Sequence, residues 1–300
     1  MNSIDIESKK FLGQPKNFVS IFNALLFDGQ PVLKPEYLKD ENSELVMNVS
    51  SKHVDIIKRY EDGTYLDLFV IESQSYVDPS MVARVMEYES VARMRYIRQN
   101  FKKHVPMHTR LPMILTVVLY VGESKWNAAK RLSELEIIHP GFEDMFNEFK
   151  LNLIELNTNH KYNTGEKATQ DFFDLLRMIY RKQILKEDLD REFNRDALYF
   201  AYVVTKNKEL LSIYRKSEKG DVKVCRALDE MFEESTNKGI QMGIKQGIER
   251  GIEQGIERGE KNTQIKIAIK MLVRNNQTLE EISEIVGLDL NALRELKKSI

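Results

Sequence analysis

The sequence of 300 residues has a single cysteine, Cys225, and no apolar run long enough to cross a membrane. One thiol excludes an internal disulfide framework and a cysteine-based zinc site, and it is typical of proteins in a reducing cytoplasm. The first eighteen residues, MNSIDIESKKFLGQPKNF, lack the apolar segment of a secretory signal. The sequence therefore predicts a cytoplasmic protein with no membrane-spanning segment.

An excess of charge of either sign is also lacking, because 45 Lys and Arg residues oppose 46 Asp and Glu residues. This balance gives no overall attraction to nucleic acid, so any such attraction must come from a local cluster of cations. The chain does have 42% hydrophobic residues, which is enough to bury a substantial core. Its length suits one large domain with a smaller piece, or two modest domains.

Hydrophobic spacing in the first part of the chain predicts a helix and then a β-hairpin. Residues 15–29 carry apolar side chains at helical spacing, with a proline at the start and a glycine at the end. Residues 53–75 contain two runs rich in β-branched and aromatic side chains. Between these runs lies Asp62-Gly63, which is a favoured hairpin turn.

One long helix and two buried strands are predicted further along. Residues 78–104 have helical spacing, with Asp78 as the N-cap and a proline at the first helical position. Residues 111–122 are an almost continuous apolar run, the pattern of a strand buried on both faces, and residues 151–156 form a further short strand. These elements together predict an α/β domain.

Helical patterns fill the remaining chain, and one of them is unusual. Residues 238–262 place glycine at every fourth position, and an isoleucine follows each of the first five glycines. A repeat longer than the 3.6 residues of a helical turn predicts a right-handed wrap around a partner helix, and hence a homo-oligomer. The alternative is a pliant tether between two folded parts.

The last residues, 263–300, predict three short helices. Thr278 and Glu281 form a capping box, Gly287 is placed as a helix stop, and Asp289 as a cap. This piece resembles a helix-turn-helix, and the alternative is a packing or assembly unit. The predicted organisation is a core at 1–160, a helical extension packed on it at 161–236, the repeat helix or linker at 237–262 and the helical tail at 263–300.

The polar end of the second hairpin strand is the strongest candidate for chemistry. Glu72 and Gln74 lie two residues apart in VIESQS and so share a face of the strand, and Asp55 lies on the partner strand. Two carboxylates at the edge of an apolar sheet are costly unless a positive charge lies between them. A hard divalent ion such as Mg²⁺ suits such oxygen ligands. The alternative is an exposed strand end with ordinary polar residues.

The stretch HVDIIKRYEDGTYLDLFVIESQSYVDPSMVARVMEY resembles the core of the Rpn family of recombination-promoting nucleases, often labelled putative transposases, in the PD-(D/E)xK superfamily. LPMILTVVLYVGESKWNAAKRLSEL, FKLNLIELN and the glycine repeat extend the resemblance over most of the chain. It implies a PD-(D/E)xK restriction-endonuclease-like mixed sheet flanked by helices, with a C-terminal helical extension. The implied activity is metal-dependent hydrolysis of phosphodiester bonds in DNA, in recombination or transposition.

The resemblance also implies roles for individual residues. Asp55 and Glu72 are expected to bind Mg²⁺ or Mn²⁺, and the backbone carbonyl of Ser73 to add a third oxygen. Gln74 takes the place of the usual lysine, so it can orient water or phosphate but cannot act as a base. Arg84 lies where family members have similar residues, and a phosphate contact is expected of it.

Residues 90–110 contain several cations and no acidic residue. The cations are Arg93, Arg95, Arg98, Lys102, Lys103 and Arg110. Such clusters hold phosphate backbones with an affinity that falls steeply as salt rises. The alternative is a solvated helix end, but the position just after the nuclease-like motif favours DNA-backbone binding without sequence readout.

Three hypotheses about function follow from the sequence. The first is a metal-dependent DNA endonuclease, and the second is a catalytically weak DNA-binding or regulatory protein that retains the nuclease fold. The third is an oligomeric scaffold whose tail is the working part. A metal-dependent cleavage assay separates the first hypothesis from the other two, and salt-sensitive DNA binding without metal separates the second from the third.

Overall fold

A computed structural model describes residues 3–41, 56–63, 66–184, 188–217 and 220–300 of the chain. The chain forms two compact units, Met1–Glu230 and Met231–Ile300. Within the described residues, no helix has the length and apolar character needed to span a bilayer.

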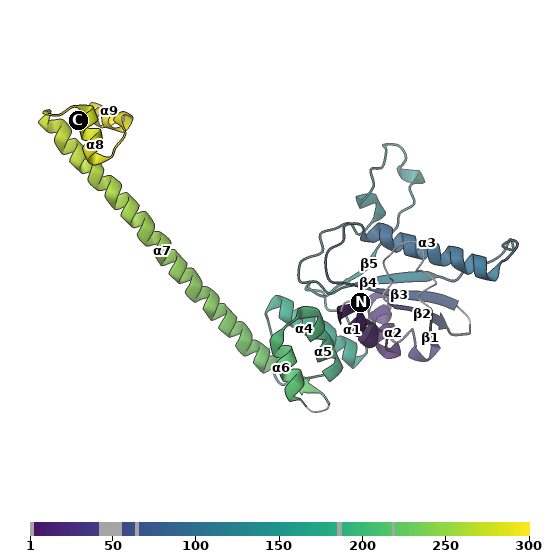
Figure 1. The fold of residues 1–300 in the computed structure, drawn as a ribbon. Helices are drawn as coiled ribbons and strands as arrows, with labels where there is room; N and C mark the ends of the chain where they lie inside the picture. Colours follow the sequence, from purple (N-terminus) through teal and green to yellow (C-terminus); the bar gives the residue numbers. More distant parts are fainter. Residues whose placement is uncertain (1–2, 42–55, 64–65, 185–187, 218–219) are drawn as a thin grey trace. The chain divides into compact units, whose positions relative to one another are not determined.

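A five-stranded mixed sheet forms the centre of the first unit, with the strands in the order β1-β2-β3-β4-β5 (Figure 1). The first three strands are antiparallel to one another, whereas β3, β4 and β5 run parallel. The bounds are β1 (Leu38–Asp40), β2 (Ile56–Glu61), β3 (Leu66–Gln74), β4 (Ile114–Tyr120) and β5 (Asn152–Glu155). The predicted α/β class with a mixed sheet flanked by helices is confirmed.

The hairpin of β2 and β3 forms where the sequence predicts it. Its register runs from Ile56 opposite Ile71 to Glu61 opposite Leu66, and Gly63 has a φ of 89°, in the left-handed region that glycine adopts without strain. The predicted buried strand is β4, which is parallel to β3. A parallel pair needs a long crossover connection, and a helix in the intervening segment provides it.

Helices cover both faces of this sheet. On one face lies α2 (Pro15–Phe27), where the rings of Phe22 and Phe69 are 4.8 Å apart. On the other lies the crossover helix α3 (Met81–Asn100), whose Tyr88 clusters with Leu68 and Val70 of β3. Side chains alternate along a strand, so even-numbered residues of β3 face α3 and odd-numbered ones face α2.

The start of α3 differs from the prediction. The sequence places Asp78 as the N-cap, but the helix begins at Met81 after Ser80. The carboxylate of Asp78 instead accepts hydrogen bonds from the backbone N–H and the hydroxyl of Ser80, at 2.9 and 2.7 Å. The predicted start was therefore wrong by two residues, because the Ser80 groups that bind Asp78 belong to the turn before the helix.

A group of helices and a small second sheet complete the first unit. The rings of Phe11, Phe172 and Phe200 stack together and join α1, α4 and α5. The bounds are α1 (Ser3–Leu12), α4 (Lys167–Arg181), α5 (Arg195–Thr205), α6 (Lys208–Lys216), β6 (Glu192–Phe193) and β7 (Val222–Lys223). Short 3-10 helices lie at η1 (Pro35–Tyr37), η3 (Leu132–Glu134) and η4 (Glu143–Met145).

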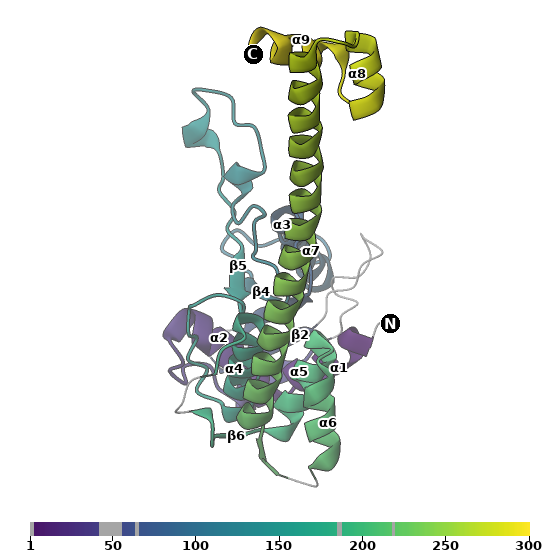
Figure 2. The same cartoon turned by 90° about the vertical axis from the view of Figure 1, so that its left-hand side faces the viewer.

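The second unit contains most of one long helix and two short helices, as Figure 2 shows. The helices are α7 (Cys225–Arg274), α8 (Leu279–Val286) and α9 (Leu290–Lys298). The capping box of Thr278 with Glu281, the left-handed Gly287 and the cap by Asp289 are all confirmed. These three helices bury a small core of Ala268, Leu272, Ile282, Val286 and Leu293.

The glycine repeat is helical, as predicted, and lies within α7. A Cβ added to any of the six glycines from Gly239 to Gly259 would meet no atom within 4 Å. The five isoleucines of the repeat, from Ile240 to Ile256, are 55–58% exposed. The single chain thus leaves the stripe uncovered, and homo-oligomerisation through it stays a prediction.

Candidate active site

The candidate site lies at the carboxyl end of β3, on the face covered by α3. Glu72 and Gln74 share this face, and each is only 4% exposed. In the parallel pairing with β4 they stand beside Val118 and Tyr120. Because both side chains are buried, the alternative of an exposed strand end with ordinary polar residues is wrong. A buried carboxylate requires a compensating charge.

That compensating charge comes from Arg84 on the first turn of α3. Its Nη2 lies 2.9 Å from Oε1 of Glu72, and its Nη1 lies 2.5 Å from Oδ2 of Asp78. Its Nε and Nη2 also donate to the hydroxyl of Tyr88, one helical turn later, at 3.1 and 2.8 Å. All four side chains lie in a largely buried cluster that joins β3, the following loop and α3.

The cluster fixes the protonation states of its members. Burial alone would lower the pKa of Arg84, but its contacts with Asp78, Tyr88 and Glu72 outweigh burial and raise it. Burial likewise acts to raise the pKa of Asp78, yet hydrogen bonds from Ser80 and Arg84 prevail and lower it. Burial and the Glu72 charge raise the pKa of Tyr88. At neutral pH the cluster therefore holds a guanidinium, an ionised Asp78 and a neutral phenol.

The structure brings Glu72 into contact with Arg84 and places Gln74 on the same face of β3, but Asp55 lies outside the described residues. The next residue, Ile56, is paired with Ile71, the residue before Glu72. Ser73 follows Glu72 in β3 and points to the opposite face. Arg84, for which a phosphate contact was expected, contacts carboxylates in this structure.

The donor chemistry of the site fits a hard divalent cation. In the described part of the chain, no group of three or more His, Cys, Asp or Glu side chains is placed to hold a metal. Mg²⁺, however, is commonly held by one or two carboxylates, with waters and substrate phosphates completing its shell. The side chains of Glu72, Asp78 and Arg84 together carry two negative charges and one positive charge, which leaves a net negative charge for a cation.

Asp78 is the functional residue that sequence reasoning missed. It was assigned to helix capping, whereas its carboxylate also binds Nη1 of Arg84, while Glu72 binds Nη2. The usable signal was the spacing: an aspartate six residues before an arginine, across a helix start, places both side chains at the first turn.

The cationic residues after the site lie on the end of α3 and the loop that follows it, and we call residues 90–113 the basic segment. Arg93 is bound at 2.8 Å to the buried Glu89, which also accepts from the backbone N–H of Thr116 at 3.1 Å. Arg93 is thus a structural partner of Glu89. The other cations make no ion pair with any described residue: Arg95, Arg98, Lys102, Lys103 and Arg110.

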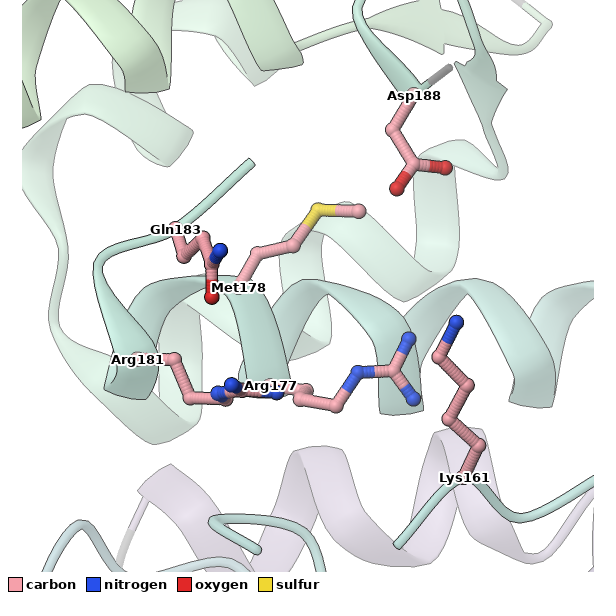
Figure 3. A pocket seen from close by; sticks show the side chains of 6 residues that line it. All are labelled: Lys161, Arg177, Met178, Arg181, Gln183 and Asp188. Atoms are coloured by element: carbon pink, nitrogen blue, oxygen red, sulfur yellow. The ribbon is translucent and has the colours of Figure 1, made fainter. Parts of the chain in front are cut away.

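A separate small cavity near the end of α4 is lined by cationic side chains (Figure 3). In this view the guanidinium of Arg177 lies next to the amine of Lys161, and Arg181 lies at the left on the same helix as Arg177. Its volume of about 40 Å³ is room for a few water molecules. A cavity of this volume is too small for a nucleotide. Arg177, moreover, is already bound to Asp174 at 2.7 Å.

The comparison with family models decides the relationship of the chain. The model described as "Putative transposase, YhgA-like" matches residues 36–210, more than half of the chain. The chain belongs to this family. The match spans β1 to β5 and the cluster of Glu72 and Arg84, so the candidate site lies within the matched region. No curated protein and no solved structure matched the chain.

Proposed function

We propose that the protein is a metal-dependent DNA endonuclease that acts in recombination or transposition of mobile DNA. Its active site, at the carboxyl end of β3, would hydrolyse phosphodiester bonds. The observation that carries the proposal is the buried carboxylate of Glu72, held at 2.9 Å by Arg84 at the end of a parallel strand. Membership of a family of putative transposases supports DNA as the substrate.

Asp55 and Glu72 would hold Mg²⁺ or Mn²⁺, and the backbone carbonyl of Ser73 would add a third oxygen. When bound, such an ion polarises the phosphate and lowers the pKa of a bound water. The pairing of Ile56 with Ile71 supports a shared site, because Asp55 directly precedes the first and Glu72 directly follows the second.

The chain's own residues orient the reacting groups. Arg84 holds Glu72 in one rotamer, and Asp78 and Tyr88 in turn hold Arg84, so the carboxylate is preorganised. Gln74 is buried, and its Nε2 donates to no other group in the described part of the chain. A buried amide N–H without a partner is costly, and a water or a phosphate oxygen would satisfy it.

We propose that the basic segment contacts the DNA backbone. Changing Arg95, Arg98 and Lys102 together to glutamate is expected to weaken binding to unrelated duplexes alike. Each lost phosphate contact should reduce the salt slope of log K by about 0.9. Arg93 is left unchanged, because it neutralises the buried Glu89. The measurement is fluorescence anisotropy over a salt series, and unchanged affinity would show that the segment is only a solvated helix end.

A second candidate function is a DNA-binding or regulatory protein that retains the fold but cleaves weakly. Two observations favour it: Arg84 already supplies a positive charge to Glu72, and Gln74 stands where a charged lysine is usual. Both reduce the attraction of the site for a metal and a phosphate.

Plasmid nicking separates the two functions. We expect the wild-type chain to convert supercoiled DNA to open circles in Mg²⁺ and to stop when EDTA removes the ion, because the reaction needs the metal. Duplex binding without any nicking in Mg²⁺ or Mn²⁺ would instead support the regulatory candidate.

A further inference from the structure

An arm projects from the sheet between β4 and β5, as the teal loop in Figure 1 shows. We call residues 132–149 the acidic arm. Its base is closed by the backbone N–H of Leu132, which donates to the carbonyl of Phe149 at 2.9 Å. The hydroxyl of Ser133 donates to Glu148 at 2.6 Å, and Phe146 packs against the buried cluster beneath. The arm is therefore anchored at its base.

The outer part of the arm presents large apolar side chains to solvent. Ile137 is fully exposed, Met145 is 77% exposed, and Phe142 and Leu135 are about half exposed. Covering a single Ile or Met side chain is worth about 1.5–3 kcal/mol. Several large exposed apolar side chains on one anchored arm are typical of a surface that binds another macromolecule.

The charge of the arm narrows the class of partner. It contains five acidic residues and no Lys or Arg: Glu134, Glu136, Glu143, Asp144 and Glu148. An apolar wedge that enters DNA must approach phosphates, which would repel this charge. The partner must instead present cations beside exposed apolar side chains.

The basic segment of this same chain has that combination. Met107 is 93% exposed, and Met94, Val105 and Met113 are about half exposed. Five cations of the segment lack an ion pair within the described residues. The arm has the same number of acidic residues. Among the described residues, no ion pair joins the arm to the basic segment of its own chain.

We propose that the acidic arm of one copy docks on the basic segment of a second copy. The two surfaces differ, so the contact is heterologous and each chain offers one arm and one basic segment. The exposed apolar side chains of the arm supply affinity, and the opposite charges supply specificity and a faster rate of association. The contact does not depend on nuclease chemistry.

Two variants of the full chain test this contact by sedimentation velocity without DNA. The arm variant carries Glu136→Lys, Glu143→Lys and Asp144→Lys, and the segment variant carries Arg98→Glu, Lys102→Glu and Lys103→Glu. All six side chains are exposed, so circular dichroism should be unchanged. Each variant alone should associate at least roughly tenfold more weakly than the wild type, because several charge pairs are lost.

The mixture of the two variants is the decisive sample. The segment variant retains an intact arm, and the arm variant retains an intact basic segment, so mixing should restore one contact per pair. Ile137→Ser, which keeps every charge, should also weaken the wild-type association. The proposal is overturned if the mixture sediments as the average of its components, or if either charge variant sediments like the wild type. A failure of plasmid nicking would leave these results unaffected.

Discussion

Replacing Glu72 with glutamine is expected to lower Mg²⁺-dependent plasmid nicking by on the order of 100-fold or more, because a metal ligand supplies several kcal/mol of transition-state stabilisation. Glutamine has nearly the same shape, so the buried site keeps its packing. Arg84 also keeps Asp78 as a partner at 2.5 Å. The measurement is the initial nicking rate at saturating Mg²⁺.

Glu89→Gln is the matched control for this substitution. Glu89 is also a buried glutamate bound to an arginine on α3, but it contacts Arg93 and the backbone of Thr116, away from the end of β3. We expect this variant to nick DNA within a few-fold of the wild type, after correction for any loss of folded protein. Equal losses in both variants would mean that Glu72 matters for folding and not for chemistry.

Replacing Arg84 with methionine is expected to destabilise the first unit by about 3–5 kcal/mol, because it leaves Glu72 and Asp78 without their guanidinium. For a unit of this size the melting temperature should fall by roughly 6–20 °C. Arg84→Lys keeps the charge but not the planar fork, so its loss should be smaller. Equal losses in the two variants would show that Arg84 contributes through the hydrogen bonds of its planar fork, and not through charge alone.

The loss of folding stability in Arg84→Met should depend on pH in a defined direction. In the wild type the pKa of Asp78 lies below its ordinary value of 3.8. Its contribution is therefore present at neutral pH and is lost as the pH falls below that value, through the lowered pKa. In Arg84→Met the Ser80 hydrogen bonds remain but the guanidinium is gone, so the pKa of Asp78 rises relative to the wild type. The variant therefore loses less stability than the wild type when Asp78 is protonated. The gap in melting temperature should narrow as the pH falls from 7 toward 4, and a widening gap would refute this account.

Local signals made much of the fold predictable. Asp62-Gly63 places the turn between β2 and β3, and the capping box of Thr278 with Glu281 places the start of α8. Both depend on residues within a few positions of one another, whose preferences act before the chain packs. The apolar run that becomes β4 was equally clear, because a strand covered on both faces has no polar side to conceal it.

Sequence reasoning named Glu72, Gln74 and Arg84 of the candidate site, but it predicted neither the ion pairs of Arg84 nor the place of Asp78 in the site. Spacing put Glu72 and Gln74 on one face of a strand, and the structure shows that both are buried. The contact of Arg84 with Glu72 joins residues twelve positions apart on different elements, so no local pattern encodes it. The sequence consequently indicated two repelling carboxylates, whereas the structure places a guanidinium at Glu72.

The most direct test of a metal site shared by Asp55 and Glu72 is thermal unfolding of the wild type and Asp55→Ala over a Mg²⁺ titration. A ligand that binds only the folded state at 100 times its Kd stabilises it by about 2.7 kcal/mol. For a unit of this size that corresponds to a rise of roughly 5–10 °C in melting temperature. We predict this rise for the wild type and none for Asp55→Ala. An equal rise in both proteins, or no rise in the wild type at any Mg²⁺ concentration, would contradict the assignment of the metal site.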